Sequence, residues 1–264
     1  MVFQAGIAQV RGSWSSETIT VTGIPSGIRS LCPSTAAMPR TATVTRKTRE
    51  TDISATWNLD AAGANDIATG IGFLDHMIDA LAKHSGTTIM LSCKGDLHID
   101  GHHTTEDCGI VLGQCLRQAL GDRLGIERFG HMACPLDEAL VAATIDISGR
   151  GWLTYELKPT AANVGGLATE LVPEFFGALA DQACVTMHLH QVSGRNSHHV
   201  IEAGFKAFAR ALRQAIRVTD TGTLATNRIV GEILPAYVDM DRLLDRLAPF
   251  TERLRTNPDA TFTP

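Results

Sequence analysis

The chain has 264 residues, which is enough for one large domain or two small ones around a buried core. Hydrophobic residues make up 44% and charged residues 19%, as in ordinary globular proteins. The formal net charge of -5 argues against a nucleic-acid-binding protein, because affinity for the phosphate backbone requires a concentrated positive surface. No stretch approaches the roughly 18 consecutive apolar residues of a membrane span. We therefore expect a protein with neither nucleic acid nor membrane among its partners.

The first 49 residues differ in composition from the rest of the chain. They hold one acidic residue, Glu17, together with several arginines and many serines and threonines. That composition is typical of an organellar transit peptide, which would indicate a plastid location. We favour the alternative of an upstream start codon and a cytoplasmic protein, since Met38 opens a credible mature N-terminus, MPRTATVTRKTRE. In either case we expect residues 1–40 to be an extension of the folded part.

From residue 51 onward, strand and helix patterns alternate. Residues 51–59 read as a strand, and residues 73–84 have the apolar face of an amphipathic helix. Residues 87–99 resemble a strand or hairpin, and residues 103–120 a helix that Gly121 ends.

The same order of elements returns in the second part of the chain. Residues 139–148 and 151–158 are strand-like, and residues 171–181 look helical. Residues 184–192 alternate like a strand, and residues 198–218 form a long helix. The pattern predicts a doubled α+β unit, each half a small sheet with two helices. The predicted divisions are 41–134, 135–220 and a tail over 221–264.

A sequence repeat carries the candidate chemistry. HHTTEDCGIVLGQCLRQAL, which begins at His102, aligns without a gap with HHVIEAGFKAFARALRQAI, which begins at His198. On a helix, residues i and i+4 share a face while neighbours diverge by about 100°, so His102 and Glu106 converge and His103 projects elsewhere. Such a His-His pair suits bridging two metal sites better than chelating one metal.

Each copy is preceded by a further candidate ligand on the preceding predicted helix, His76 in the first half and Glu174 in the second. One copy alone is more often a capped, solvated helix start, but two copies in register favour a metal centre. Nitrogen and oxygen ligands without thiolate favour six-coordinate Mn(II) or Fe(II) over structural zinc. The eight candidate ligands are His76, His102, His103, Glu106, Glu174, His198, His199 and Glu202.

The other titratable residues are expected to be structural. For the carboxylates of Asp107, Asp137 and Glu138 we favour capping or core hydrogen bonding over orienting a ligand from outside the metal shell. The cysteines contain no C-x-x-C pair and are expected to be free buried thiols in a reducing compartment. The remaining histidines, expected in the core or on the surface, are His84, His98, His131, His188 and His190.

Over residues 43–220 the sequence resembles the imidazoleglycerol-phosphate dehydratase family. The shared signatures stand in collinear order and are long, which makes the match highly specific. They are TRET at 48–51, FLDHM at 73–77, GDLHIDGHHTTED at 95–107, GIERFG at 125–130, PLDEAL at 135–140, SGR at 148–150 and GRNSHHVIEAGFKAFARALRQAI at 194–216.

The resemblance implies a fold of two tandem ferredoxin-like α+β units with pseudo-twofold symmetry, each with a sheet packed on helices. It implies a lyase of histidine biosynthesis that converts imidazoleglycerol phosphate into imidazole acetol phosphate and water, with two Mn(II) ions per active site. It further implies a homo-oligomer of 24 subunits with sites between subunits. By the family pattern the eight candidates above are the metal ligands. Catalytic roles fall on Glu50, Glu202 and His76, and phosphate binding on Arg128, Arg150 and Lys206.

The chain departs from the family pattern at two places. The usual C-terminal Ser-Lys-Gly segment, whose serine and lysine help to hold phosphate, is absent, and no lysine follows Lys206. In its place, residues 240–254 read as an amphipathic helix, so we expect weaker substrate binding or a substitute cation. Gly72 stands where the family has proline, which loosens the approach to the His76 helix.

Three functions remain open from the sequence. The first is an active Mn(II) dehydratase, which the retention of Glu50, Arg128, Arg150 and Lys206 favours. The second is a metal-organised assembly without turnover, since an altered tail is compatible with lost catalysis. The third is a dinuclear enzyme for another imidazole or phosphate compound, which product analysis would distinguish from the first.

Overall fold

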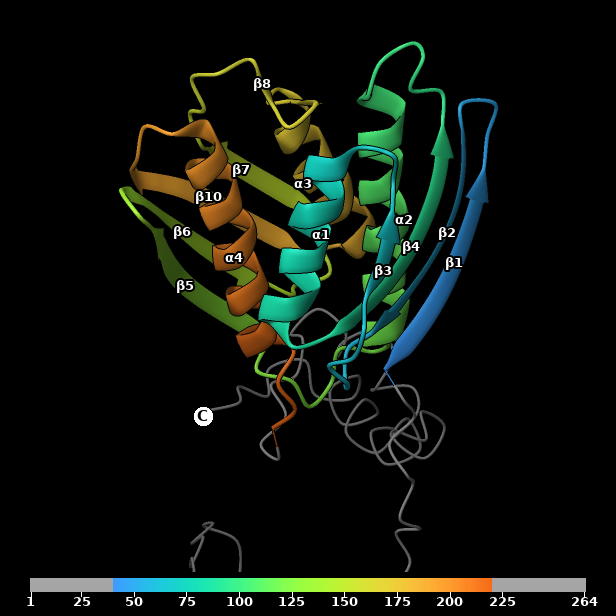
Figure 1. The fold of residues 1–264 in the computed structure, drawn as a ribbon. Coiled ribbons are helices and arrows are strands. Elements are labelled where there is room, and N and C mark those ends of the chain that lie inside the picture. Colours follow the sequence, from blue (N-terminus) through green and yellow to red (C-terminus); the bar gives the residue numbers. More distant parts are fainter. Residues whose placement is uncertain (1–39, 220–264) are drawn as a thin grey trace, which may run out of the picture. The chain divides into compact units, whose positions relative to one another are not determined.

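The computed structural model describes residues 40–219, which form an α+β fold with two four-stranded sheets and four helices (Figure 1). The first sheet has the order β1 (Thr41–Lys47), β2 (Thr51–Asn58), β4 (Thr88–Gly95) and β3 (Asp66–Ala68). The second has the order β5 (Phe129–Leu136), β6 (Ala139–Asp146), β10 (Thr186–Ser193) and β7 (Trp152–Glu156). The helices are α1 (Gly72–Ser85), α2 (His102–Leu120), α3 (Leu171–Ala183) and α4 (Ser197–Ala215).

The two sheets have the same topology, which confirms the doubled unit. In each, three strands are antiparallel and the fourth, β3 or β7, runs parallel to its neighbour. By chain order, α3 in the second unit corresponds to α1 in the first, and α4 corresponds to α2. The second half alone inserts a short hairpin, β8 (Asn163–Val164) and β9 (Leu167–Ala168), before its first helix. The chain is thus two tandem ferredoxin-like units.

The helices lie between the two sheets (Figure 1). Helix α2 packs on β1 and β2, and α4 packs on β5 and β6. Alternation along the strands supplies the apolar faces: in β2, Ile53, Ala55 and Trp57 are buried while the residues between them are more exposed. None of the helices between residues 40 and 219 is both long and apolar enough to cross a membrane.

The helices pair across the repeats, α1 with α4 and α2 with α3. The contact of α2 with α3 depends on two glycines, because a Cβ at Gly109 would lie 2.5 Å from the carbonyl oxygen of Phe175. A Cβ at Gly113 would lie 2.7 Å from the carbonyl oxygen of Leu179. Cross-pairing brings side chains from distant parts of the sequence together, and this is how the site described below is formed.

Replacing Gly113 by alanine is expected to lower the free energy of unfolding by about 1–3 kcal/mol, since the new methyl group must push α3 away from α2. The matched control is Gly72→Ala, because a Cβ at Gly72 meets nothing within 4 Å. Thermal unfolding of both variants checks the prediction. Equal melting temperatures for the two variants would contradict the close approach.

Most predicted elements are confirmed, with shifted ends. The helices predicted at 73–84 and 198–218 are α1 and α4, and Gly121 does end α2. The predicted boundary between residues 134 and 135 was wrong, because it falls inside β5, which belongs wholly to the second sheet. All five cysteines between residues 40 and 219 are free, as expected. Residues 1–39 of the extension predicted over 1–40, and the tail helix predicted at 240–254, lie outside the described residues.

Candidate metal centre

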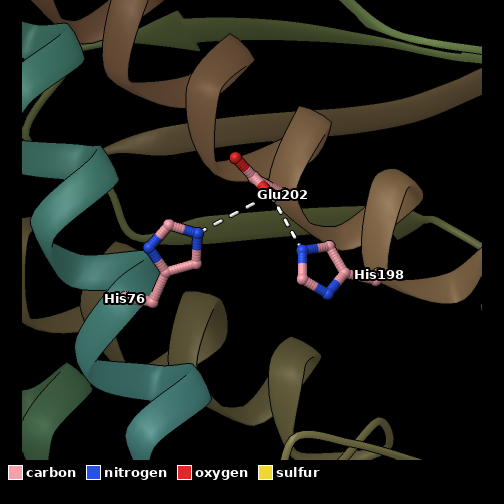
Figure 2. A group of neighbouring side chains, drawn as sticks. All are labelled: His76, His198 and Glu202. Atoms are coloured by element: carbon pink, nitrogen blue, oxygen red, sulfur yellow. Dashed lines mark hydrogen bonds and ion pairs between the residues drawn. The ribbon is translucent and has the colours of Figure 1, made fainter.

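Three side chains from the two repeats converge between α1 and α4. The Nε2 atom of His198 lies 3.0 Å from a carboxylate oxygen of Glu202, and the Nε2 atom of His76 lies 3.7 Å from the same oxygen. Figure 2 shows the carboxylate of Glu202 between the two imidazoles, with His76 on α1 and the other two on α4. The ligand-capable atoms of all three lie within 4.8 Å of one another.

Local structure explains how α4 presents its two residues. Asn196 caps the helix, and its side chain accepts hydrogen bonds from the backbone N–H groups of His198 and His199. The i,i+4 spacing then places His198 and Glu202 on one face, next to α1. The convergence of these two residues was predicted from the repeat.

Lys206, one turn further along α4, belongs to the same group. Its ammonium lies 2.7 Å from the second carboxylate oxygen of Glu202. Burial raises the pKa of Glu202, but the Lys206 ammonium and the two nearby imidazoles outweigh it, so the net effect is a lowered pKa. The Glu202 carboxylate is therefore held in the ionised form that can bind a cation.

The second histidine of each pair is turned away from this arrangement and bonded to a different carboxylate. The Nδ1 atom of His103 lies 3.0 Å from Asp96, and the Nδ1 atom of His199 lies 2.8 Å from Glu138. These carboxylates raise the pKa of His103 and of His199. Glu138 was expected to cap a helix or to bond in the core. It does accept from backbone N–H groups, but it also bonds to the candidate ligand His199. Asp107 does have the expected core role, accepting from Arg46 and Thr51.

The first repeat shows a looser version of the cluster. The Nε2 atom of His102 lies 3.6 Å from the Glu106 carboxylate. Glu174 occupies the place on α3 that His76 holds on α1, but it is exposed and makes no hydrogen bond or ion pair within residues 40–219. In this part of the chain, the group of His76, His198 and Glu202 is the one set whose donor atoms gather closely enough for a metal ion.

Glu50 lies at the same end of the first sheet as the histidines of α2. It occupies the turn between β1 and β2 and is close enough to His103 to help raise the pKa of that imidazole. Its own side chain makes no hydrogen bond or ion pair with the described residues. Glu50 is thus a carboxylate that is available beside the candidate ligands.

The predicted phosphate-binding arginines lie elsewhere. Arg128 precedes β5 and donates to Asp146 at 2.7 Å, and Arg150 lies at this same end of the sheet, where its carbonyl accepts from Thr186. His199 meets Glu138 at the opposite end of β5. A strand of 8 residues spans about 26 Å, so the structure does not bring the two arginines to the histidine cluster of the same protomer.

The donor set fits a divalent transition metal. Two imidazole nitrogens and one carboxylate oxygen are the ligand types of such ions, and an octahedral ion with bonds of about 2.1 Å holds adjacent donors about 3 Å apart. The separation of 3.0 Å between His198 and Glu202 matches this spacing, and the 3.7 Å between His76 and Glu202 is 0.7 Å longer. Three protein donors would leave the other positions of a six-coordinate ion to water, substrate or further side chains.

A doubled ferredoxin-like fold whose helix starts carry paired histidines and glutamates defines a class of α+β proteins with a histidine–carboxylate centre. The profile of the imidazoleglycerol-phosphate dehydratase family matches residues 69–212. The chain is 53% identical over 179 residues to the imidazoleglycerol-phosphate dehydratase of Jannaschia sp. strain CCS1, covering 68% of this chain and 92% of the relative. It is 55% identical over 186 residues to that of Synechococcus elongatus, covering 70% and 88%.

Solved structures agree with this result. The crystal structure of imidazoleglycerol-phosphate dehydratase from Staphylococcus aureus has a TM-score of 0.62 and 38% identity, covering 68% of this chain and 99% of that one. The enzyme from Pyrococcus furiosus, solved in complex with (S)-C348, has a TM-score of 0.60 and 36% identity, covering 67% and 95%. This chain belongs to the imidazoleglycerol-phosphate dehydratase family, whose members are hydro-lyases.

Proposed function

We propose that this protein dehydrates imidazoleglycerol phosphate to imidazole acetol phosphate in histidine biosynthesis, using two Mn(II) ions per active site. The observation that carries the metal requirement is the convergence of His76, His198 and Glu202 from two repeats within 4.8 Å. We also propose a cytoplasmic location, since the relatives reported above are bacterial. A plastid location would apply only if residues 1–40 act as a transit peptide.

The reaction removes a carbon-bound proton and a hydroxide from the glycerol chain next to the imidazole ring. Metal ions held by the candidate ligands would stabilise the ring in its anionic form, which favours loss of hydroxide from the carbon next to the ring. Glu50 is the base of this proposal, because its carboxylate makes no hydrogen bond or ion pair within residues 40–219 and is near enough to His103 to help raise the pKa of that imidazole. Hydroxide leaves from the carbon next to the ring and Glu50 takes the proton from the following carbon, and the two together make up the water released. The enol that remains becomes the ketone. The Lys206 ammonium and the two arginines bind the phosphate and fix the orientation of the chain.

The distribution of these residues supports a site shared between copies of the chain. The arginines and the histidine cluster lie at opposite ends of the second sheet, separated by about 26 Å along a strand. A small substrate cannot reach both within one protomer. We therefore propose a homo-oligomer, of 24 subunits by the family pattern, in which a neighbouring copy supplies Arg128 and Arg150 to the metal centre.

The test is turnover of imidazoleglycerol phosphate by metal-stripped protein, measured as ketone formation with and without added Mn(II). We expect little product from stripped protein. Adding Mn(II) should restore product formation, because the ion would bind again to the three clustered ligands. A folded, Mn(II)-loaded assembly that forms no ketone would overturn the proposal. Product formation without any divalent metal would remove its metal requirement.

A further inference from the structure

Two histidine–carboxylate pairs stand at corresponding places in the two repeats. His103 on α2 is bonded through Nδ1 to Asp96, whose side chain is 12% exposed. His199 on α4 is bonded through Nδ1 to Glu138. A carboxylate accepts only, so each contact places the proton of a neutral imidazole on Nδ1 and the lone pair on Nε2. The Nε2 atom of His199 faces the exposed Asp137 carboxylate at 3.6 Å, which is beyond hydrogen-bond distance.

We infer that Asp96 and Glu138 are positioning residues that fix the tautomer and ring orientation of His103 and His199 for metal binding through Nε2. This inference rests on the proposed metal-dependent function. Hydrogen-bonded carboxylates behind metal-binding imidazoles increase ligand basicity and restrict ring rotation. The first histidine of each pair is oriented differently, since His198 directs Nε2 toward the glutamate of its own helix.

The two pairs are built from different parts of the repeat. Glu138 lies in the turn before β6, and the corresponding turn before β2 holds Glu50. In the second repeat the turn glutamate is fully engaged: one oxygen accepts from His199 and the other from the backbone N–H groups of Arg195 and Asn196. These bonds lower the pKa of Glu138 to about 2, with the Asn196 N–H contributing most.

In the first repeat, Asp96 from the end of β4 takes over the bond to the second histidine. Glu50 is consequently released from the role that Glu138 has in the second repeat, and its side chain makes no hydrogen bond within residues 40–219. The two turn carboxylates therefore have different roles. Glu138 is bonded to the candidate ligand His199, and Glu50 is left to accept and donate protons.

The experiment measures Mn(II) affinity by titration, following the electron paramagnetic resonance of the free ion, in the full chain. We expect Asp96→Ala to weaken Mn(II) binding by about 10–100-fold. Asp96→Asn retains an acceptor for the Nδ1 proton, so its loss should stay below about 10-fold. The matched control is Glu156→Ala, which removes a bond of 3.0 Å to Nδ1 of His190, a histidine that is not a candidate ligand.

Thermal unfolding and light scattering of each variant accompany the titrations, so that loss of folding or assembly is distinguished from loss of affinity. If Asp96→Ala binds Mn(II) as tightly as the wild type, the positioning role is overturned while the proposed function stands. An equal loss in Glu156→Ala would also overturn it. If the wild type itself binds no Mn(II), the metal requirement of the proposed function fails, and this inference fails with it.

Discussion

Glu50→Gln is expected to lower kcat by about 10²–10⁴-fold while leaving Mn(II) binding and assembly intact. Glutamine preserves the size of the side chain but cannot accept a proton from carbon. Assembly and folding should persist because the Glu50 side chain makes no hydrogen bond or ion pair within residues 40–219. Ketone formation under saturating substrate and Mn(II) gives kcat, and the same Mn(II) titration gives the affinity.

The control for Glu50→Gln is Glu156→Gln, a glutamate at the end of β7 that is bonded to His190 rather than to a candidate ligand. It should turn over at the wild-type rate. A Glu50→Gln protein within a few-fold of wild type in kcat would assign the proton transfer to another group. A large loss of Mn(II) affinity in this variant would instead indicate that Glu50 acts through the metal ligands.

Much of the fold could be predicted because hydrophobic periodicity and the repeat point to the same answer. The helices were predicted within a few residues of their ends, and the His-His pairs were placed at helix starts, as α2 and α4 show. Short or edge strands were missed. β3 has 3 residues, too few for a period to be recognised. β5 alternates in burial, but it has Gly130 on its buried side and the exposed Phe129 on the other, so its hydropathy does not show the period.

The site could be predicted only in part, because tertiary packing decides which ligands meet. Sequence proximity does not say which His-His helix faces His76; the cross-pairing of α1 with α4 selects His198 and Glu202. The bond of Asp96 to His103 could not be predicted from helical spacing, because Asp96 lies in the loop before α2, seven residues before His103. A carboxylate at a strand end just before a ligand-bearing helix is the feature that would have found it.

Mixing two inactive variants is expected to restore activity. Glu202→Ala removes a proposed metal ligand, and Arg128→Ala removes a proposed phosphate-binding cation at the far end of the second sheet. Each protein alone should form almost no ketone. If a site takes its metal ligands from one subunit and its arginine from a neighbour, random co-assembly of equal amounts leaves both intact in about a quarter of the sites.

The comparison that decides is between subunits dissociated and reassembled together and the same two proteins reassembled separately before mixing. Recovery to about a quarter of wild-type ketone formation in the first sample and none in the second requires a site shared between copies. No recovery from a co-assembled oligomer of wild-type size would place both residues in the site of one protomer. The strand length between them argues against that outcome, because a guanidinium at one end of β5 cannot contact a substrate held at the other.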